Sequence, residues 1–490
     1  MNLTNKNIRG FDFDLSQLNK ADVININESK TPLAHVHAGS LRRIFLHFQL
    51  QQWLLGDNYK SNILIGNDDY DPYDYFPIYF NEAQRKQYQV FLGHPLCSVP
   101  APEGKGNYAD YYFDEMIEIL RNNFGIIVKT YKTSELYRQG FFNEGISLVL
   151  KNLNKINKIY KNITGIDDKF SSKPLQVICP KCGNMRTTKI MNYKEDEVEI
   201  VCNNYELKKV SFLGCNFKGW VSPYHGNARL FWKLEWPIRW FYMKIGVEGG
   251  RKDQNSKKGA REFAEAVYRF LFNQKPPMNL PYDFCYINAE HLPKINRFGV
   301  SATEALKFLP PQLFFDLLTT SRSTQPINID LESEKMLDIY RDYTKRYLEN
   351  HNGQLFDKIL ENVRFGNKIK LSGDQESLAK YLRYYLHNSN AVTAWFLDFT
   401  PKNVSGNEQD FLIRLVRDLE NVEKWQASDI QCVFRKVVID ANFSVKDAYS
   451  LMYKLLINRQ AGLRIGVLFE KIGRVRLIDY LKLYQLKNTI

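Results

Sequence analysis

The sequence predicts an α/β protein: a Rossmann-like domain interrupted by a small zinc-binding insertion and followed by an all-α region. Three observations support this prediction. Strand-like and helical patterns alternate near the N-terminus at βαβ spacing, four cysteines gather in one 37-residue stretch, and the C-terminal third is almost purely helical in periodicity. We expect the two halves of the Rossmann-like domain at 1–170 and 228–320, the insertion at 171–227 and the α-helical region at 321–490.

Composition restricts the class of protein. Of the 490 residues, 44% are apolar and 25% are charged, which is ordinary for a globular chain and excludes disordered and collagen-like classes. The 67 Lys and Arg exceed the 54 Asp and Glu by 13, which favours a polyanionic partner, nucleic acid first, although a basic solvated surface gives the same balance. No apolar run approaches a membrane span, and the N-terminus has no secretory core. We expect a cytoplasmic protein without membrane contact.

The first half of the Rossmann-like domain is expected to begin with a strand, a helix and a second, buried strand. Alternation and helical periodicity place these elements at 22–28, 41–55 and 61–66. Two further helices flank a short strand, at 110–122, 142–161 and, between them, 125–134. Because parallel strands need helical crossovers, this order predicts a parallel sheet.

The second half is expected to return to mixed α/β structure after the insertion. An aromatic run at 229–243 is followed by a Gly/Lys-rich loop at 246–260, a helix at 261–272 and a strand-like segment at 282–289. From about Leu331 onward no convincing strand pattern remains.

The cysteine cluster indicates a metal site. Cys179 and Cys182 form a CxxC turn followed by glycine, which lets two thiolates reach one zinc ion. Cys202 and Cys215 supply the second pair, although their spacing is not a second CxxC, and His225 is an alternative fourth ligand. Four unconnected reduced thiols are the other interpretation. Without a carboxylate in the cluster, the zinc would be structural.

Two loops that follow predicted strands carry polar residues. His37 and Gly39 precede the first long helix, where helix amides favour the phosphates of ATP, but a plain helix N-cap at Ser40 explains the same pattern. The acidic segment 68–72, Asp-Asp-Tyr-Asp-Pro, follows the second strand and is either a ligand-binding edge or a solvated turn. Farther on, tryptophans around Arg239 form either a ligand pocket or core.

Taken together and in order, these motifs resemble the class I lysyl-tRNA synthetase family. The matching segments run along nearly the whole chain. They are His37 to Arg43, Asp68 to Pro72, Gly93 to Pro100, Ser134 to Gly140, the cysteine insertion, Lys233 to Trp240 and Gly462 to Gly466.

The resemblance implies a class I synthetase Rossmann-like catalytic domain, a zinc-ribbon-like insertion and an anticodon-binding-like helical region. It implies activation of an amino acid, lysine in the family, with ATP and Mg²⁺, and transfer to tRNA. His37 and Gly39 would contact the ATP phosphates. The remaining residues implied to bind ATP or the amino acid are Ser40, Asp69, Asp71, Trp236, Lys252, Asp253 and Gln254.

The departures from the family pattern concentrate at substrate positions. The family's Lys-Met-Ser-Ser-Ser-Lys-Gly-type loop aligns with 292–299, where Phe298 replaces the catalytic lysine, so Lys294 and Arg297 are the candidates to substitute for it. A family His is Gln254, and a family Glu is Arg43, which would repel a lysine ammonium. Three functions therefore stay open: lysine activation, a tRNA-binding or regulatory paralogue without catalysis, and adenylation of another amino acid or acceptor.

Overall fold

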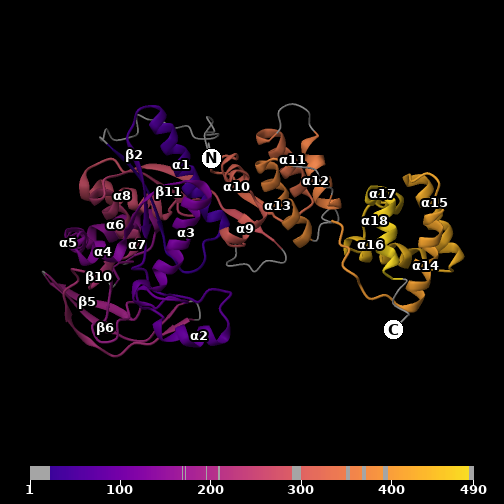
Figure 1. Cartoon of the computed structure of the whole chain (residues 1–490). Helices are drawn as coiled ribbons and strands as arrows, with labels where there is room; N and C mark the ends of the chain where they lie inside the picture. The colour runs from indigo at the N-terminus through magenta and orange to yellow at the C-terminus, as the bar shows by residue number, and fades with distance from the viewer. Residues whose placement is uncertain are drawn as a thin grey trace. The chain divides into compact units, whose positions relative to one another are not determined.

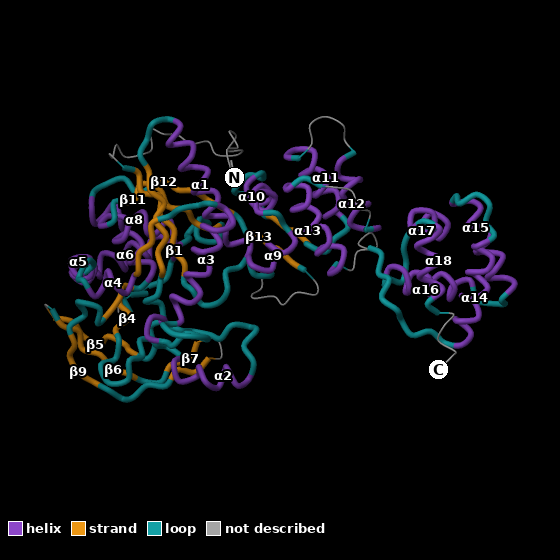
Figure 2. Tube along the Cα trace, in the orientation of Figure 1, coloured by secondary structure: helices purple, strands orange, loops and turns teal. Residues whose placement is uncertain are grey.

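The computed structural model describes most of the chain, namely residues 23–167, 169–170, 173–194, 196–207, 210–289, 299–348, 354–366, 371–389 and 396–484. These residues form two units (Figures 1 and 2). The first unit contains the described residues up to Leu306 together with Pro311–Ile329. The second contains Lys307–Pro310 and the described residues from Asp330 onward.

A five-stranded parallel sheet is the centre of the first unit. Its strands, in spatial order, are β12 (Met278–Tyr282), β11 (Ile245–Arg251), β1 (Ile24–Lys30), β2 (Ser61–Asn67) and β3 (Lys129–Lys132). Numbered among themselves along the chain, the strands run 3-2-1-4-5 from β3 to β12, which is the Rossmann arrangement. The predicted α/β fold is confirmed, and strand order reverses between β1 and β11, where such sheets bind ligands.

Helices cover both faces of this sheet (Figure 1). On one face lie α1 (Leu41–Gly56), α3 (Tyr108–Phe124) and α10 (Pro311–Thr319), and on the other lie α6 (Leu153–Thr164), α7 (Trp232–Tyr242) and α8 (Ala260–Phe272). Leu46, Leu50 and Leu54 recur at helical spacing on α1 and pack against Ile26 and Val247 of the sheet. Burial of both sheet faces explains why the central strands are rich in Ile, Val and Leu.

The expectation that 246–260 is a loop was wrong for its first half, because β11 occupies Ile245–Arg251. Pairing with parallel neighbours on both sides overrides the low strand propensity of glycine here. A side chain at Gly249 would place its Cβ 2.8 Å from the carbonyl oxygen of Leu280, so the glycine permits a close approach of β12.

Other expected elements are shorter or divided. The strand expected at 125–134 is reduced to β3, since α4 (Thr133–Arg138) begins directly after it. The helix expected at 142–161 is two helices, α5 (Asn143–Lys151) and α6, which meet at Asn152. The strand-like 282–289 contains β13 (Cys285–Asn288), which pairs with β14 (Ile327–Asp330) and not with the main sheet.

The cysteine insertion is a small β structure. Its antiparallel sheet has the order β5 (Thr188–Lys194), β6 (Glu197–Cys202) and β9 (Lys218–Val221). Two further antiparallel pairs adjoin it, β4 (Leu175–Val177) with β10 (Ala228–Leu230) and β7 (Tyr205–Leu207) with β8 (Val210–Phe212). Phe212 packs into a tyrosine-rich core with α2 (Glu82–Tyr88) and the start of α3.

The second unit is formed mainly by helices. They are α11 (Lys335–Tyr347), α12 (Leu355–Phe365), α13 (Gly373–Asn388), α14 (Gly406–Glu420), α15 (Ala427–Asp440), α16 (Val445–Ile457), α17 (Ile465–Ile472) and α18 (Arg474–Lys482). Helix α9 (Ala302–Phe308) ends where this unit begins. None of the helices in the described ranges has the length and apolar character needed to cross a membrane.

Arg42 connects α1 to the segments that follow β12 and α10. Its side chain is buried and donates hydrogen bonds to the carbonyl oxygens of Asp283, Leu318, Arg322 and Gln325 and to the hydroxyl of Ser321, at 2.8–3.3 Å. A guanidinium is the side chain suited to this role because it carries five donors in a fixed plane.

Replacement of Arg42 is expected to destabilise the first unit. Arg42→Met leaves buried carbonyl oxygens without donors, so the free energy of unfolding should fall by about 3 kcal/mol or more. Arg42→Lys should recover only part of that loss. Urea denaturation measures both, with Arg414→Met as the control because Arg414 is exposed and makes one 3.3 Å bond to Asp440. Equal stability of the Arg42 and Arg414 variants would contradict the assignment.

Candidate functional site

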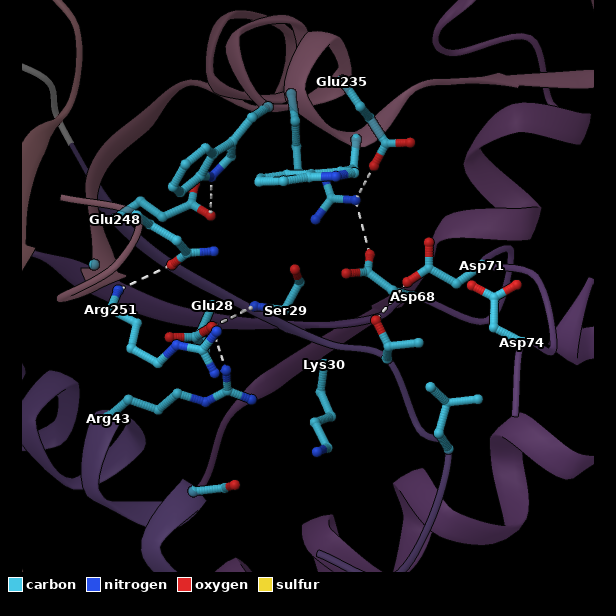
Figure 3. A pocket seen from close by; sticks show the side chains of 18 of the residues that line it. Glu28, Ser29, Lys30, Arg43, Asp68, Asp71, Asp74, Glu235, Glu248 and Arg251 are labelled. Atoms are coloured by element: carbon cyan, nitrogen blue, oxygen red, sulfur yellow. Dashed lines mark hydrogen bonds and ion pairs between the residues drawn. The ribbon is translucent and has the colours of Figure 1, made fainter. Parts of the chain in front are cut away.

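A cavity of about 570 Å³ opens at the carboxyl ends of the central strands, where the strand order reverses. Each strand end contributes charged residues: β1 contributes Glu28 and Lys30, the turn after β2 contributes Asp68, and β11 contributes Glu248 and Arg251 (Figure 3). The wall carries both acidic and basic side chains. The cavity therefore suits a ligand that carries both signs of charge.

A buried ion network forms the wall next to α7. Arg229 of β10 pairs with Asp71 and, at 2.8 Å, with Glu235. Arg239, one helical turn after Glu235, pairs with that carboxylate and, at 2.8 Å, with Asp68. Two arginines thus hold three carboxylates. Burial alone would raise the pKa of Asp68, but the guanidinium groups of Arg239 and Arg229 hold that pKa below its usual value.

Glu248 differs from the other carboxylates of the cavity. Its two oxygens accept hydrogen bonds from the indole nitrogens of Trp236, at 2.7 Å, and Trp240, at 2.6 Å. Of the described carboxylates that line the cavity, it alone forms no ion pair with an Arg, Lys or His. Burial raises the pKa of Glu248 to about 7, although the charge of Arg239 opposes this shift.

Arg43 forms an ion pair within the site. Its guanidinium lies 3.1 Å from the carboxylate of Glu28, and the two side chains face each other in Figure 3. The ion pair offsets the positive charge that Arg43 introduces. The repulsion of a lysine ammonium expected from Arg43 is therefore reduced by a neighbour on β1.

A smaller pocket of about 190 Å³ adjoins the large cavity at the start of α1. His37 and Gly39 line it, and the single turn η2 (Ala38–Ser40) carries them into α1. A Cβ at Gly39 would lie 2.6 Å from the carbonyl oxygen of Cys285, so only glycine permits this approach to β13. The two cavities are continuous, because they share the lining residues Ser40, Arg43, Arg251, Gln254 and Tyr282.

The structure brings six of the residues that the resemblance implies to contact ATP or the amino acid to these cavities. They are His37, Gly39, Ser40, Asp71, Trp236 and Gln254. Lys294 and Arg297, with Phe298, lie outside the described residues.

Three expected binding residues lie outside the cavity lining and have protein partners. Asp69 is buried and accepts hydrogen bonds from the backbone nitrogen, at 2.8 Å, and the hydroxyl of Ser134. Lys252 pairs with Asp283 at 2.9 Å, and Asp253 pairs with Arg251 at 2.7 Å. Of the adjacent aspartates, Asp68 lines the cavity.

The four cysteines of the insertion come together. The Sγ atoms of Cys179, Cys182, Cys202 and Cys215 all lie within 4.8 Å of one another. Tetrahedral zinc with Zn–S bonds of about 2.3 Å places sulfurs about 3.8 Å apart, and the observed Cys182–Cys202 separation is 3.7 Å. The set therefore fits a closed structural zinc site. The ring of His225 instead lies against the Asn143 amide, at 3.0 Å.

Within the described ranges, no other group of three or more His, Cys, Asp or Glu has the spacing of a metal site.

Several residues that line the large cavity were not predicted from the sequence, chiefly Glu28, Lys30, Arg229, Glu235 and Glu248. For Glu28 and Lys30 the available signal was their position at the end of the first predicted strand. Glu248 was hidden in a glycine-rich segment interpreted as a loop. The register of the parallel sheet pairs Glu248 with Asn27 of β1, and only this pairing places Glu248 near the carboxyl end of β1.

Comparison with known proteins identifies relatives along most of the chain. The family model described as "tRNA synthetases class I (K)" matches residues 14–363. The lysine–tRNA ligase of Thermoplasma volcanium is 22% identical over 92% of this chain and 94% of its own length. That of Methanocaldococcus jannaschii is 26% identical over 75% of this chain and 64% of its own. Among solved structures, a glutamate tRNA ligase from Elizabethkingia meningosepticum aligns over 94% of this chain with a TM-score of 0.38 and 10% identity.

The cysteine cluster predicts the metal content of the chain. The purified protein should contain about one zinc per molecule by atomic absorption, and Cys179→Ser or Cys215→Ser should lose it, since a structural site needs four ligands. His225→Ala should retain zinc, as should Cys432→Ser, whose thiol is exposed. Loss of zinc from His225→Ala with retention in Cys215→Ser would show that the fourth ligand is wrongly assigned.

Proposed function

Because the chain belongs to the class I lysyl-tRNA synthetase family, we propose that it activates lysine with ATP and transfers the lysyl group to tRNA. The charge pattern of the large cavity is the observation that supports this proposal most directly. It contains one carboxylate without an ion-pair partner among the described residues, Glu248, and this group can receive the ammonium of lysine.

Lysine fits the surroundings of Glu248. The indole rings of Trp232 and Trp236 line the same cavity, and aromatic faces cover the aliphatic stem of a lysine side chain while its ammonium reaches the carboxylate. The two indole donors fix the orientation of the Glu248 carboxylate before a ligand arrives. A carboxylate has about four lone-pair positions, so acceptor capacity remains for an ammonium group.

ATP would occupy the smaller pocket and extend into the large cavity. His37 and Gly39 lie at the start of α1, where the helix dipole favours phosphate groups, and the first turn of α1 carries no acidic residue. A carboxylate oxygen of lysine then attacks the α-phosphorus of ATP. The new P–O bond forms as the bond between the α-phosphorus and the oxygen that bridges to the β-phosphate breaks, and pyrophosphate leaves with that oxygen. A ribose hydroxyl of the terminal adenosine of tRNA next attacks the acyl carbon, and AMP leaves.

Transfer requires that the protein hold tRNA. The excess of 13 positive charges supports binding to the phosphate backbone, and the helical second unit is our candidate for contacts with exposed bases. We place this function in the cytoplasm, where tRNA and ATP are available and thiol ligands stay reduced.

Adenylation of another amino acid is the second candidate. It is favoured by Lys30, which places an ammonium without an ion-pair partner among the described residues in the same cavity. An amino acid with an uncharged or acidic side chain would then be the substrate.

ATP–pyrophosphate exchange tests the proposal. With tRNA present, lysine should support exchange, and Glu248→Gln should raise the KM for lysine about 10- to 100-fold, because a hydrogen bond to a charged group is lost. The control Glu118→Gln, at an exposed position of α3, should leave the KM unchanged. Exchange with a different amino acid would support the second candidate. Failure of all twenty in a chain that still binds tRNA would favour a non-catalytic paralogue.

The raised pKa of Glu248 predicts a pH dependence of lysine binding. Below about pH 7 the carboxyl is protonated and attracts a cation weakly, whereas above it the ionised form binds lysine, whose ammonium keeps its charge. The KM for lysine should therefore fall as the pH rises from 6 to 8. Steady-state kinetics of the Glu248→Gln variant provide the control. In this variant the change in the KM for lysine near pH 7 should vanish. If the change persists, another group is responsible for the titration.

A further inference from the structure

Lys30 is a cation in the large cavity that the proposed function leaves without a role. It is the last residue of β1, half-buried, and lines the large cavity, as do Ser40 and Arg43. Within the described part of the chain, its ammonium forms no ion pair or hydrogen bond, and in Figure 3 it extends away from the labelled carboxylates. Burial, followed by the charge of Arg43, lowers the pKa of Lys30 to about 8, although the charges of Glu28 and Glu115 oppose this shift.

The other cations of the cavity are already engaged by carboxylates. Arg43 pairs with Glu28, Arg251 with Asp253, and Arg186 with Asp74, while Arg229 and Arg239 share the buried network. An anionic ligand would have to compete with a carboxylate at each of these arginines. At Lys30 it would meet an ammonium that forms no ion pair with a described side chain, and only the more distant charges of Glu28 and Glu115 attract that ammonium. Lys30 is therefore the preferred point of contact for negative charge.

The position of Lys30 suits the phosphates of a nucleotide. The smaller pocket holds about 190 Å³, below the range of about 300–1,000 Å³ typical for small-molecule sites, so a nucleotide seated there must continue into the large cavity. The passage runs along Ser40 and Arg43, which line both cavities. Lys30 lines the large cavity together with these two residues.

We propose that Lys30 binds the phosphate groups of ATP and the pyrophosphate that leaves. This assignment rests on the proposed function for its choice of ATP as the ligand. A fixed cation at this point stabilises the charge that develops on the leaving pyrophosphate, in a cavity where water is partly excluded. The α-carboxylate of the amino acid is the other anion that enters this cavity, and the experiment separates the two.

Isothermal titration calorimetry of the full chain tests the assignment. The ligands are α,β-methylene-ATP, inorganic pyrophosphate and adenosine, and the variants are Lys30→Met and Lys30→Arg. The control is Lys60→Met, since Lys60 is exposed and directly precedes β2. Lys30→Met should weaken binding of the ATP analogue and of pyrophosphate about tenfold or more and leave adenosine unchanged. Lys30→Arg should restore most of the loss, because it keeps the charge.

Four results overturn the proposal. An unchanged affinity of Lys30→Met for pyrophosphate shows that the ammonium does not contact phosphate. Equal weakening of adenosine binding shows a structural effect, as does failure of Lys30→Arg to recover. A raised KM for lysine with unchanged nucleotide binding assigns Lys30 to the amino-acid carboxylate. If the wild-type chain binds the ATP analogue through Lys30 but exchanges pyrophosphate with no amino acid, the proposed function fails and this assignment stands.

Discussion

The buried network of Arg229 and Arg239 is the interaction on which the site depends. It joins the turn after β2 to β10, which directly follows the insertion, and to the first turns of α7, so it connects both halves of the Rossmann-like domain across the inserted residues. Each arginine bridges two carboxylates, and the hydroxyl of Tyr137 donates a further bond to Glu235 at 2.8 Å. Loss of one partner would leave an uncompensated buried charge, which costs about 3–5 kcal/mol.

This network also determines which charges remain for a ligand. Because three of the acidic side chains are held by two arginines, they line the cavity without being available to a cation. Two charged groups of the cavity have no ion-pair partner in the described chain. They are Glu248, whose carboxylate accepts hydrogen bonds from neutral indoles, and Lys30. One unpaired charge of each sign matches the ammonium of lysine and the phosphates of ATP. The departures from the family pattern therefore do not by themselves exclude its chemistry.

The sequence predicted the fold class better than the site. Alternating strand and helix patterns and the cysteine cluster were sufficient for a Rossmann-like domain with an insertion, because hydrophobic periodicity is a local signal. The segment around Glu248 was interpreted as a loop, since glycines lower strand propensity, and only pairing with β1 and β12 makes it a strand.

Site residues depend on contacts between distant segments. Adjacent aspartates 68 and 69 cannot be ranked from sequence, yet one lines the cavity and the other binds Ser134. The partner of Arg43 likewise becomes visible only when β1 lies beside α1, which places Glu28 3.1 Å from the guanidinium. The sequence pattern favours Cys215 as the fourth ligand with His225 as an alternative, and the geometry groups only the cysteine with the other three.

The most direct test of lysine recognition by Glu248 is a crystal structure of the chain with a non-hydrolysable lysyl-adenylate analogue. The lysine ammonium should contact Glu248 between the indole rings, with the adenosine beside His37 and Gly39. An analogue bound with its ammonium at a different carboxylate, or with the Glu248 carboxylate shielded from it, would show that Glu248 does not select the substrate.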